Sequence, residues 1–516
     1  MPPLSIRQKH PANKLSNELI VLILEQVEPD SDKTVPVDRR QFLSVESFDC
    51  PPRSPRGRDI GLVRLASRRF AQLGAPFLFT RISGRLSKRG LQKLEQLAEW
   101  PHLTQHVRMF SYMVPYFYAK GDVPSQELLS QLKASFGSEN VARFQAKVHE
   151  QRHILDASDD LRVLKKTVAT FTSLQHVKLL RTQDDEDNAL LQFIRQNAET
   201  RHLVHLEWAA ACSHASKTIG TALLASKNVP WSRFSSPMLS PQSAEFLNWR
   251  RPASLSTLAE RLTCLTLHFD DGIDMDAKMV ELSSLFRTVF LAAKGMQAVH
   301  IGFPESSPLE IPLEAVFHNV TWDRLVAFGV QGWKLDTDEI LGFARRHKER
   351  LKGLRLRRVL LNEGSLWKHV LTGLRESMHR LEWVSLRRIG YADQYEGDLH
   401  GVEVRDDLES ESESDLEDYD PMVGPSSSNV HRHEGTVSDD ERDTDTDSDD
   451  EHGPAAHDMD FPPLDSPVTP ASAPWCSCDS EVDAIDDLED DGTAISNTKR
   501  KAWEKWVVRR CFVHNG

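Results

Sequence analysis

Four arginines and two aromatic residues recur late in the chain at positions suited to ligand recognition. They are Arg324, Phe328, Arg355, Arg357, Trp383 and Arg387. A guanidinium binds a carboxylate or phosphate through two parallel hydrogen bonds, and aromatic rings add apolar contact area. The set predicts non-covalent binding of an acidic or phosphorylated group on a protein substrate. Strand ends that simply carry charge into solvent are the alternative interpretation.

Residues for covalent catalysis or metal binding form no recognisable set. The chain has no G-x-x-x-x-G-K-[ST] phosphate loop, no G-x-S-x-G turn and no H-E-x-x-H pair. Cys476 and Cys478 form the only close pair among the six cysteines, and no second Cys or His pair lies nearby to complete four zinc ligands. We therefore expect no enzyme activity, no metal site and no cofactor.

A repeated template L-x-x-L-x-L must position the arginines. It begins at Leu174, Leu203, Leu262, Met296, Trp322, Leu351 and Leu381. Successive first positions differ by 29, 59, 34, 26, 29 and 30, and the difference of 59 suggests a degenerate repeat between 209 and 261. The template residues would face the core, and the residues between them would face a binding surface.

Helical patterns separate the predicted strands, at 188–195, 276–294, 336–348 and 365–376. A strand followed by a helix, repeated with a period of about 29 residues, is typical of an αβ leucine-rich-repeat solenoid, or horseshoe. The fold class that we predict is therefore α/β. An ordinary α/β domain with coincidental spacing is the alternative.

The first predicted helix is apolar in almost every direction. It covers residues 15–27, LSNELIVLILEQV, with Ser16 as its expected N-cap. A loop rich in Pro and Arg follows at about 29–58, and we expect Asp59 to cap a second helix that continues to Leu73. Residues 1–60 contain too little other apolar material to cover the first helix, which indicates a partner outside the chain.

Residues 15–27, 62–70 (LVRLASRRF) and 73–82 (LGAPFLFTRI) resemble the F-box of filamentous-fungal F-box proteins. The resemblance departs from the family pattern at Ser16, at Ala66 and in its longer inserted loop. It implies a helical module that docks on the Skp-type linker of an SCF ubiquitin ligase, and through it on a cullin. The linker-binding residues that it implies are Leu15, Glu18, Leu19, Ile20, Ile23, Leu24, Leu62, Leu65 and Phe70.

A strongly acidic stretch follows the repeats. From Glu396 to Asp491 the sequence has 33 Asp and Glu against three Arg, so this stretch has a net charge of −30. The whole chain has a net charge of −14, so the residues outside the stretch carry +16. Such a composition predicts a disordered tail that can fold back on the basic solenoid face in an intramolecular contact. Candidate phosphorylation sites, each with an acidic residue three positions downstream, are Ser410, Ser412, Ser414, Ser438, Thr444, Thr446 and Ser448.

The predicted organisation is a flexible N-terminus at 1–14, an F-box-like module at 15–85, a solenoid at 86–395, the acidic tail at 396–491 and a basic, Trp-containing segment at 492–516. No apolar run is long enough to span a bilayer, and the start lacks the layout of a signal peptide. We expect a soluble cytoplasmic or nuclear adaptor with no membrane or nucleic-acid partner. The alternative function is a non-ligase leucine-rich-repeat scaffold with an acidic regulatory tail.

Overall fold

A computed structural model of the chain describes residues 15–27, 55–120, 137–182, 204–241, 252–269, 274–304, 307–395, 490, 492 and 495–508. Several predictions lie outside these residues: those for the N-terminal segment 1–14, the helix at 188–195, the acidic segment up to residue 489 and the seven candidate phosphorylation sites. In the described part of the chain, no helix is both long and apolar enough to cross a bilayer.

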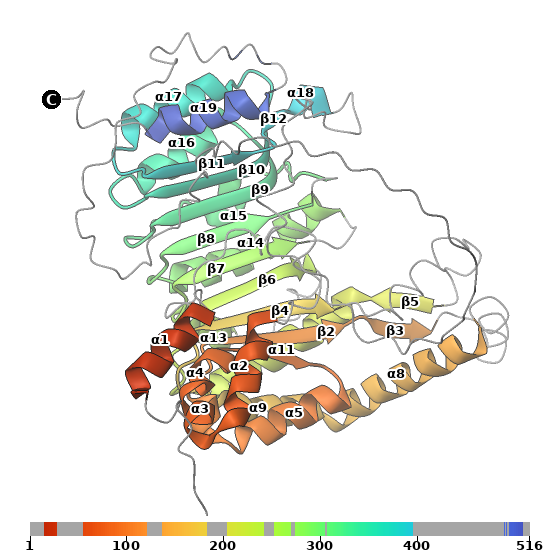
Figure 1. Cartoon of the computed structure of the whole chain (residues 1–516). Helices are drawn as coiled ribbons and strands as arrows, with labels where there is room; N and C mark the ends of the chain where they lie inside the picture. The colour runs from red at the N-terminus through yellow and green to blue at the C-terminus, as the bar shows by residue number, and fades with distance from the viewer. Residues whose placement is uncertain are drawn as a thin grey trace, which may run out of the picture. The chain divides into compact units, whose positions relative to one another are not determined.

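A ten-stranded sheet whose strands follow chain order forms the centre of the fold (Figure 1). Its strands are β1 (Arg81–Arg85), β2 (Met109–Pro115), β4 (His176–Thr182), β6 (Arg233–Leu239), β7 (Cys264–Phe269), β8 (Ala298–Gly302), β9 (Ala327–Leu335), β10 (Gly353–Leu361), β11 (Trp383–Arg387) and β12 (Gly390–Tyr391). Neighbours from β1 to β11 pair in parallel, and β12 pairs with the end of β10. The predicted α/β class is confirmed.

The later strands recur at a regular interval. The register partners at the start of β6 to β11 are Arg233, Cys264, Ala298, Ala327, Gly353 and Trp383, whose positions differ successively by 31, 34, 29, 26 and 30. Strand β6 fills the place of the degenerate repeat predicted between 209 and 261. The period read from the template is therefore present in the sheet.

Two of the template matches are wrong. The match at Leu203 falls on β5 (Val204–Glu207), which pairs antiparallel with β3 (Phe117–Lys120) in a separate two-stranded sheet. The match at Trp322 is displaced, because Phe328 is the register partner of the core residue Leu354. The template in this repeat therefore begins at Leu325.

The sheet also begins earlier than predicted. Strand β1 lies inside the predicted module 15–85 and pairs with β2, from Arg81 opposite Met109 to Arg85 opposite Met113. Neither strand contains a Leu, so neither matches the template.

Helices connect the strands, and their apolar sides share one core with one face of the sheet. They are α5 (Lys88–Ala98), α6 (Pro101–Thr104), α8 (Ser138–Ala157), α9 (Asp159–Val168), α11 (Trp208–Ala225), α13 (Pro252–Ala259), α14 (Met275–Ala292), α15 (Leu313–Phe317), α16 (Thr337–Arg346) and α17 (Trp367–Ser377). A short helix, α18 (Ala392–Tyr395), follows the last strand. The helices predicted at 276–294, 336–348 and 365–376 are confirmed as α14, α16 and α17. A capping box formed by Asp336 and Glu339 fixes the start of α16.

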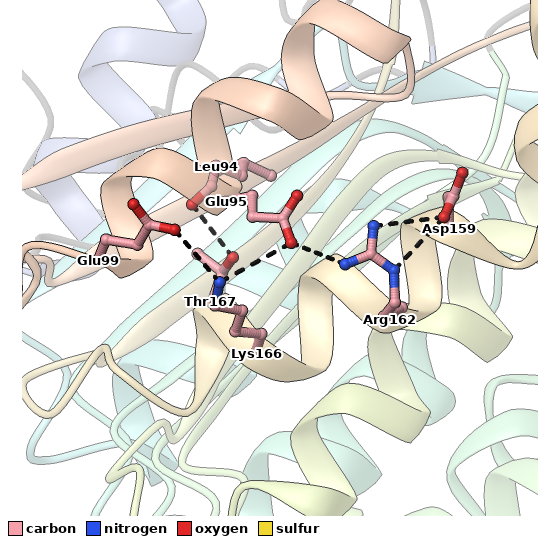
Figure 2. Close-up of polar contacts among 7 residues, drawn as sticks. All are labelled: Leu94, Glu95, Glu99, Asp159, Arg162, Lys166 and Thr167. Carbon is pink, nitrogen blue, oxygen red and sulfur yellow. Dashed lines mark hydrogen bonds and ion pairs between the residues drawn. The ribbon is translucent and has the colours of Figure 1, made fainter.

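Ion pairs on the surface join α5 to α9 (Figure 2). Arg162 lies 2.7 Å from Glu95 and 3.3 Å from Asp159, and Lys166 lies 3.8 Å from Glu95. Thr167 donates a hydrogen bond of 3.3 Å to the carbonyl of Leu94. Exposed pairs of this kind contribute little stability each, so the buried apolar contacts hold the two helices and the ion pairs align them.

Four short helices precede the sheet: α1 (Asn17–Val27), α2 (Pro55–Ala66), α3 (Arg68–Leu73) and α4 (Ala75–Leu78). Ser16 accepts a hydrogen bond from the N–H of Leu19, as expected of an N-cap. The second helix differs from the prediction, because it begins at Pro55 and ends at Ala66. Ser67 then caps α3 by accepting a hydrogen bond from the N–H of Phe70.

A last helix, α19 (Asn497–Val508), packs on the edge of the sheet beside α17 and β11 (Figure 1). Trp503, Trp506 and Val507 are buried in the main core. Glu504 accepts a hydrogen bond from the N–H of Leu386, and Arg500 donates one to the carbonyl of the same residue. In the sequence, the acidic segment therefore follows α18 and precedes α19.

Candidate functional site

Seven large apolar side chains at the start of the chain are exposed. They are Leu15, Leu19, Leu22, Ile23, Leu62, Val63 and Leu65, and we call them the apolar helix surface. Ile23 is 52% exposed and Leu65 83% exposed. Among the described residues, only three other large apolar side chains are exposed, Trp100, Val280 and Leu291, and they lie elsewhere in the chain. Exposed apolar area is therefore concentrated on α1 and α2.

The module has a small core of its own that orients this surface. Ile20, Leu24 and Ile60 are buried together, and Phe70 and Leu73 are among the residues that pack against them. Arg69 donates hydrogen bonds to the side chain of Asn17, at 2.7 Å, and to the carbonyl of Leu15, at 2.6 Å. These bonds fix the start of α1 against α3.

The predicted linker-binding residues are divided between the core and the surface. Leu15, Leu19, Ile23, Leu62 and Leu65 lie on the apolar helix surface, and Glu18 is exposed in the first turn of α1. Ile20 and Leu24 are buried, and Phe70 is half-buried against them, so these three serve the module core. Sequence reasoning missed Leu22 and Val63. The apolar run of both helices contained them, but only the structure shows which side is covered.

The second candidate is the face of the main sheet that points away from the helical core. In the paired strands, residues such as Leu354 and Leu356 enter the core, and the residues between them point to the opposite face. Ten basic or imidazole side chains occupy these alternate positions, and we call them the basic face: Arg81, Arg85, His176, Lys178, Arg233, His268, His300, Arg355, Arg357 and Arg387. The described strands of this sheet contain no Asp or Glu.

Close packing around Gly329 brings part of the basic face together. Gly329 lies in register between His300 on β8 and Arg355 on β10. A methyl group at Gly329 would overlap Nδ1 of His300 and lie 3.1 Å from Cβ of Arg355. The glycine therefore allows His300 and Arg355 to approach each other across β9.

His300 is held neutral in this position. Burial lowers the pKa of its imidazole well below the usual range, and the charges of Arg355 and Arg357 lower it further. Within the described structure, its Nε2 is buried and has no hydrogen-bond partner. A neutral imidazole can offer this nitrogen to a ligand as a donor or an acceptor.

Other imidazoles of the basic face bond to neighbouring strands and loops. Nε2 of His176 lies 2.6 Å from Oγ of Ser235, and Nε2 of His268 lies 3.2 Å from the carbonyl of Phe303. Burial, followed by the nearby charge of Lys178, lowers the pKa of His176 well below the usual range. On the basic face the Lys and Arg side chains, and not His176 or His300, therefore carry the charge, and Lys178 and Arg355 are themselves buried.

Three of the six predicted substrate-binding residues belong to the basic face, Arg355, Arg357 and Arg387, and a fourth, Trp383, lies on the same side of the sheet. Arg324 is exposed but precedes β9, so it is not part of the face. Phe328 is in the core, 3.7 Å from Phe343 between ring centroids, and its predicted place on the binding surface is wrong.

Sequence reasoning missed the other members of the basic face, many of which lie on β1, β4 and β6. The template did not find β1 or β6, and on β4 the alternate positions were not read as part of the surface. Alternation of basic and apolar residues in HVKLL, at 176–180, was the signal available in the sequence.

Left-handed backbone residues line up across the last strands. Gly332 on β9, Arg358 on β10 and Arg388 after β11 have φ of 65°, 50° and 48°. They are equivalent in the register of the three repeats. Glycine adopts this conformation easily, whereas a non-glycine residue there costs about 1–3 kcal/mol. Two arginines are thus kept in strained positions beside the basic face.

Within the described residues, no group of three His, Cys, Asp or Glu side chains is placed to hold a metal ion. Burial raises the pKa of the Cys264 thiol to about 11, so it is protonated at neutral pH. Buried Asp160 lies 2.6 Å from Nε2 of His214 and accepts a hydrogen bond of 3.2 Å from Tyr112. This cluster joins α9, α11 and β2.

No model of a known protein family matches the chain, and no curated protein matches its sequence. The functional proposal therefore rests on the apolar helix surface and the basic face.

Proposed function

We propose that the protein is a non-enzymatic substrate-recognition adaptor of an SCF-type, cullin-RING E3 ubiquitin ligase. In this proposal α1 to α4 are an F-box-like module that docks on a Skp-type linker, and the strand–helix repeats are a leucine-rich-repeat-like solenoid that binds a protein substrate. The observation that carries the proposal is the apolar helix surface.

Burial of this surface in a complex would be strongly favourable. Removing a large aliphatic side chain from water contributes about 1.5–3 kcal/mol, and seven such side chains lie on or beside two neighbouring helices. Contiguous apolar patches on a folded surface mark interaction sites. An amphipathic partner helix laid along α1 and α2 would supply the missing cover.

The sheet supports the second half of the proposal. Its strands follow chain order and recur at a regular interval from β6 to β11, with a helix on the same side of each connection that the structure describes. Repeats of this kind present one broad face to a partner. The basic face would favour a substrate segment rich in carboxylate or phosphate groups.

Ile23→Asp tests the linker-docking role. A charge at this exposed position should weaken binding of a Skp-type linker by about 30-fold or more, because the carboxylate would be desolvated in the interface. The control is Leu291→Asp on α14, where the native side chain is 54% exposed. Calorimetric titration of both full-length variants with the linker measures the difference. Linker binding by Ile23→Asp at wild-type affinity would contradict the adaptor assignment.

A scaffold without ligase function is the second candidate, and one observation favours it. Ala75 and Phe79, at the end of the helical module, belong to or pack against the core of the main sheet, and the carbonyl of Thr80 accepts a hydrogen bond from the N–H of Arg108. The module therefore also caps the first strands. Purification from the native cells separates the two candidates, since a linker and a cullin should accompany only an adaptor.

A further inference from the structure

We propose that the acidic segment 396–489 is an intramolecular ligand of the basic face, tethered at both ends to the β10–β12 end of the sheet. This inference is independent of ligase function. It identifies one occupant for the basic face and implies that any acidic substrate must displace it.

Both ends of the acidic segment are fixed by hydrogen bonds. Tyr391, in β12, donates a hydrogen bond to the carboxylate of Asp490, which also accepts one of 2.7 Å from the N–H of Lys368. The side chain of Gln394 donates a hydrogen bond of 2.6 Å to the carbonyl of Gly492. Residues before and after the segment therefore meet at one place, near the strands that carry Arg355, Arg357 and Arg387.

Docking of α19 strengthens the attachment at the C-terminal end of the acidic segment. Arg375 on α17 donates a hydrogen bond to the carbonyl of Trp506, and its guanidinium lies 4.5 Å from the centre of the Trp506 ring. With Trp503 and Trp506 in the core, the C-terminal end of the segment cannot leave without unfolding a buried contact. A ligand attached at two ends is present at an effective concentration in the millimolar range.

Charge makes the segment and the face complementary. The stretch from Glu396 to Asp491 contains 33 acidic residues, and the described strands of the main sheet contain none. Seven Lys or Arg of the basic face lie on β1, β4, β6, β10 and β11.

The segment is also long enough to reach them. Neighbouring strands are about 4.8 Å apart, so the sheet is on the order of 40 Å across, well within the reach of a chain that advances up to about 3.3 Å per residue.

The geometry around His300 specifies the chemistry of the contact. Arg355 and Arg357 provide the charge, and the unpartnered Nε2 of His300 provides a neutral donor that can bond a carboxylate or phosphate oxygen. Two residues with strained backbone, Arg358 and Arg388, directly follow Arg357 on β10 and Arg387 on β11. Backbone strain persists where the surrounding structure and a ligand require it.

The test measures binding of a labelled acidic probe to the full chain by fluorescence anisotropy. The probe is a fluorescein-labelled peptide with the sequence of residues 434–451. In a loop-neutral variant, every Asp and Glu between 403 and 451 becomes Asn or Gln. We expect this variant to bind the probe about ten-fold more tightly than the wild type, because a tethered competitor at millimolar concentration has been removed. The gain should diminish between about 0.02 M and about 0.3 M salt.

Two further variants locate the contact. Arg387→Gln combined with Arg388→Gln, introduced into the loop-neutral chain at two exposed positions, should abolish the gain. Arg345→Gln combined with Lys348→Gln removes two exposed charges of the α16 region and should leave the gain unchanged. Equal probe affinity in the wild-type and loop-neutral chains would overturn the proposal, and so would a gain that survives Arg387→Gln with Arg388→Gln.

Discussion

The buried histidines of the sheet make stability depend on pH. His176 and His300 have pKa values well below the ordinary value of 6.5, and burial is the first cause for both. The unfolded chain therefore binds more protons than the folded chain once the pH falls below about 6.5, so acid favours unfolding. At neutral pH the two histidines do not reduce the unfolding free energy. The unfolding free energy falls as the pH drops through the pKa of histidine in the unfolded chain and continues to fall below it.

We predict that the unfolding free energy falls by up to about 1.4 kcal/mol per pH unit for each fully buried histidine. His300→Gln should reduce the slope by one such contribution, because it removes an imidazole whose protonation in the fold is opposed first by burial and then by the charges of Arg355 and Arg357. Urea unfolding of the wild type and the variant at several pH values between about 5 and 7.5 measures the slope.

Arg358 should oppose stability and support ligand binding. Its φ of 50° is unfavourable for a side chain, and Arg358→Gly should raise the unfolding free energy by about 0.5–1 kcal/mol. The same change should weaken binding of an acidic peptide, because one guanidinium is lost. Arg357 lies on the same strand but does not have a positive φ, so Arg357→Gly should destabilise the protein instead. Equal stability changes in the two variants would refute the strain argument.

At the level of single residues, the sequence predicts which face of the sheet a side chain occupies wherever the first residue of the L-x-x-L-x-L template is assigned correctly. Arg355, Arg357, Trp383 and Arg387 follow from alternation in strands whose Leu positions are unambiguous. Phe328 does not, because both Trp322 and Leu325 can begin the template and both are buried. Only pairing with β10 distinguishes the two frames.

The attachment of α19 to the sheet edge involves one ionisable side chain, Glu504, whose charge opposes docking. Glu504 is largely buried, and burial raises its pKa above the ordinary value. A raised pKa means that the ionised carboxylate is disfavoured in the fold, so docking of α19 is strongest at low pH and weakens as the pH rises through that pKa.

We predict that Glu504→Gln stabilises the docked helix at neutral pH. The amide oxygen can still accept the hydrogen bond from Leu386, and the buried charge is gone. Thermal unfolding should show a higher Tm for the variant at pH 7, with the difference shrinking in acid as the wild-type carboxyl protonates. A Tm lower than that of the wild type at pH 7 would show that the ion pair with Arg500, at 3.6 Å, outweighs desolvation.

The elements found from the sequence are those with local signals. Asp336 and Glu339 mark the start of α16, and an amphipathic pattern marks α14 and α17. Strands β1, β2 and β6 lack the Leu template and are defined by their neighbours in the sheet. Helix α19 was recognised as a basic, Trp-containing segment, but its place beside β11 depends on contacts with residues far earlier in the chain, such as Leu386.

On the scale of the whole molecule, cleavage should leave the two ends together. A protease site inserted near residue 440 should yield fragments that co-elute in gel filtration, because Trp503, Trp506 and Val507 remain in the core. Trp503→Ala should release the C-terminal fragment, since removing a buried Trp side chain costs about 3–5 kcal/mol. Separation of the wild-type fragments in physiological buffer would show that α19 docks too weakly to anchor the acidic segment.

The late position of α19 in the chain has a consequence for biosynthesis. Strand β11 ends at Arg387, whereas the helix that satisfies the backbone of Leu386 begins at Asn497. At a translation rate of about 5–20 residues per second, roughly 5–20 s pass before α19 can leave the ribosome. During that time the outer edge of β11 presents unpaired N–H and carbonyl groups, a template for strands of other nascent chains on the same message. Between these two points the ribosome makes the acidic stretch, whose negative charge would keep neighbouring chains apart until the helix arrives.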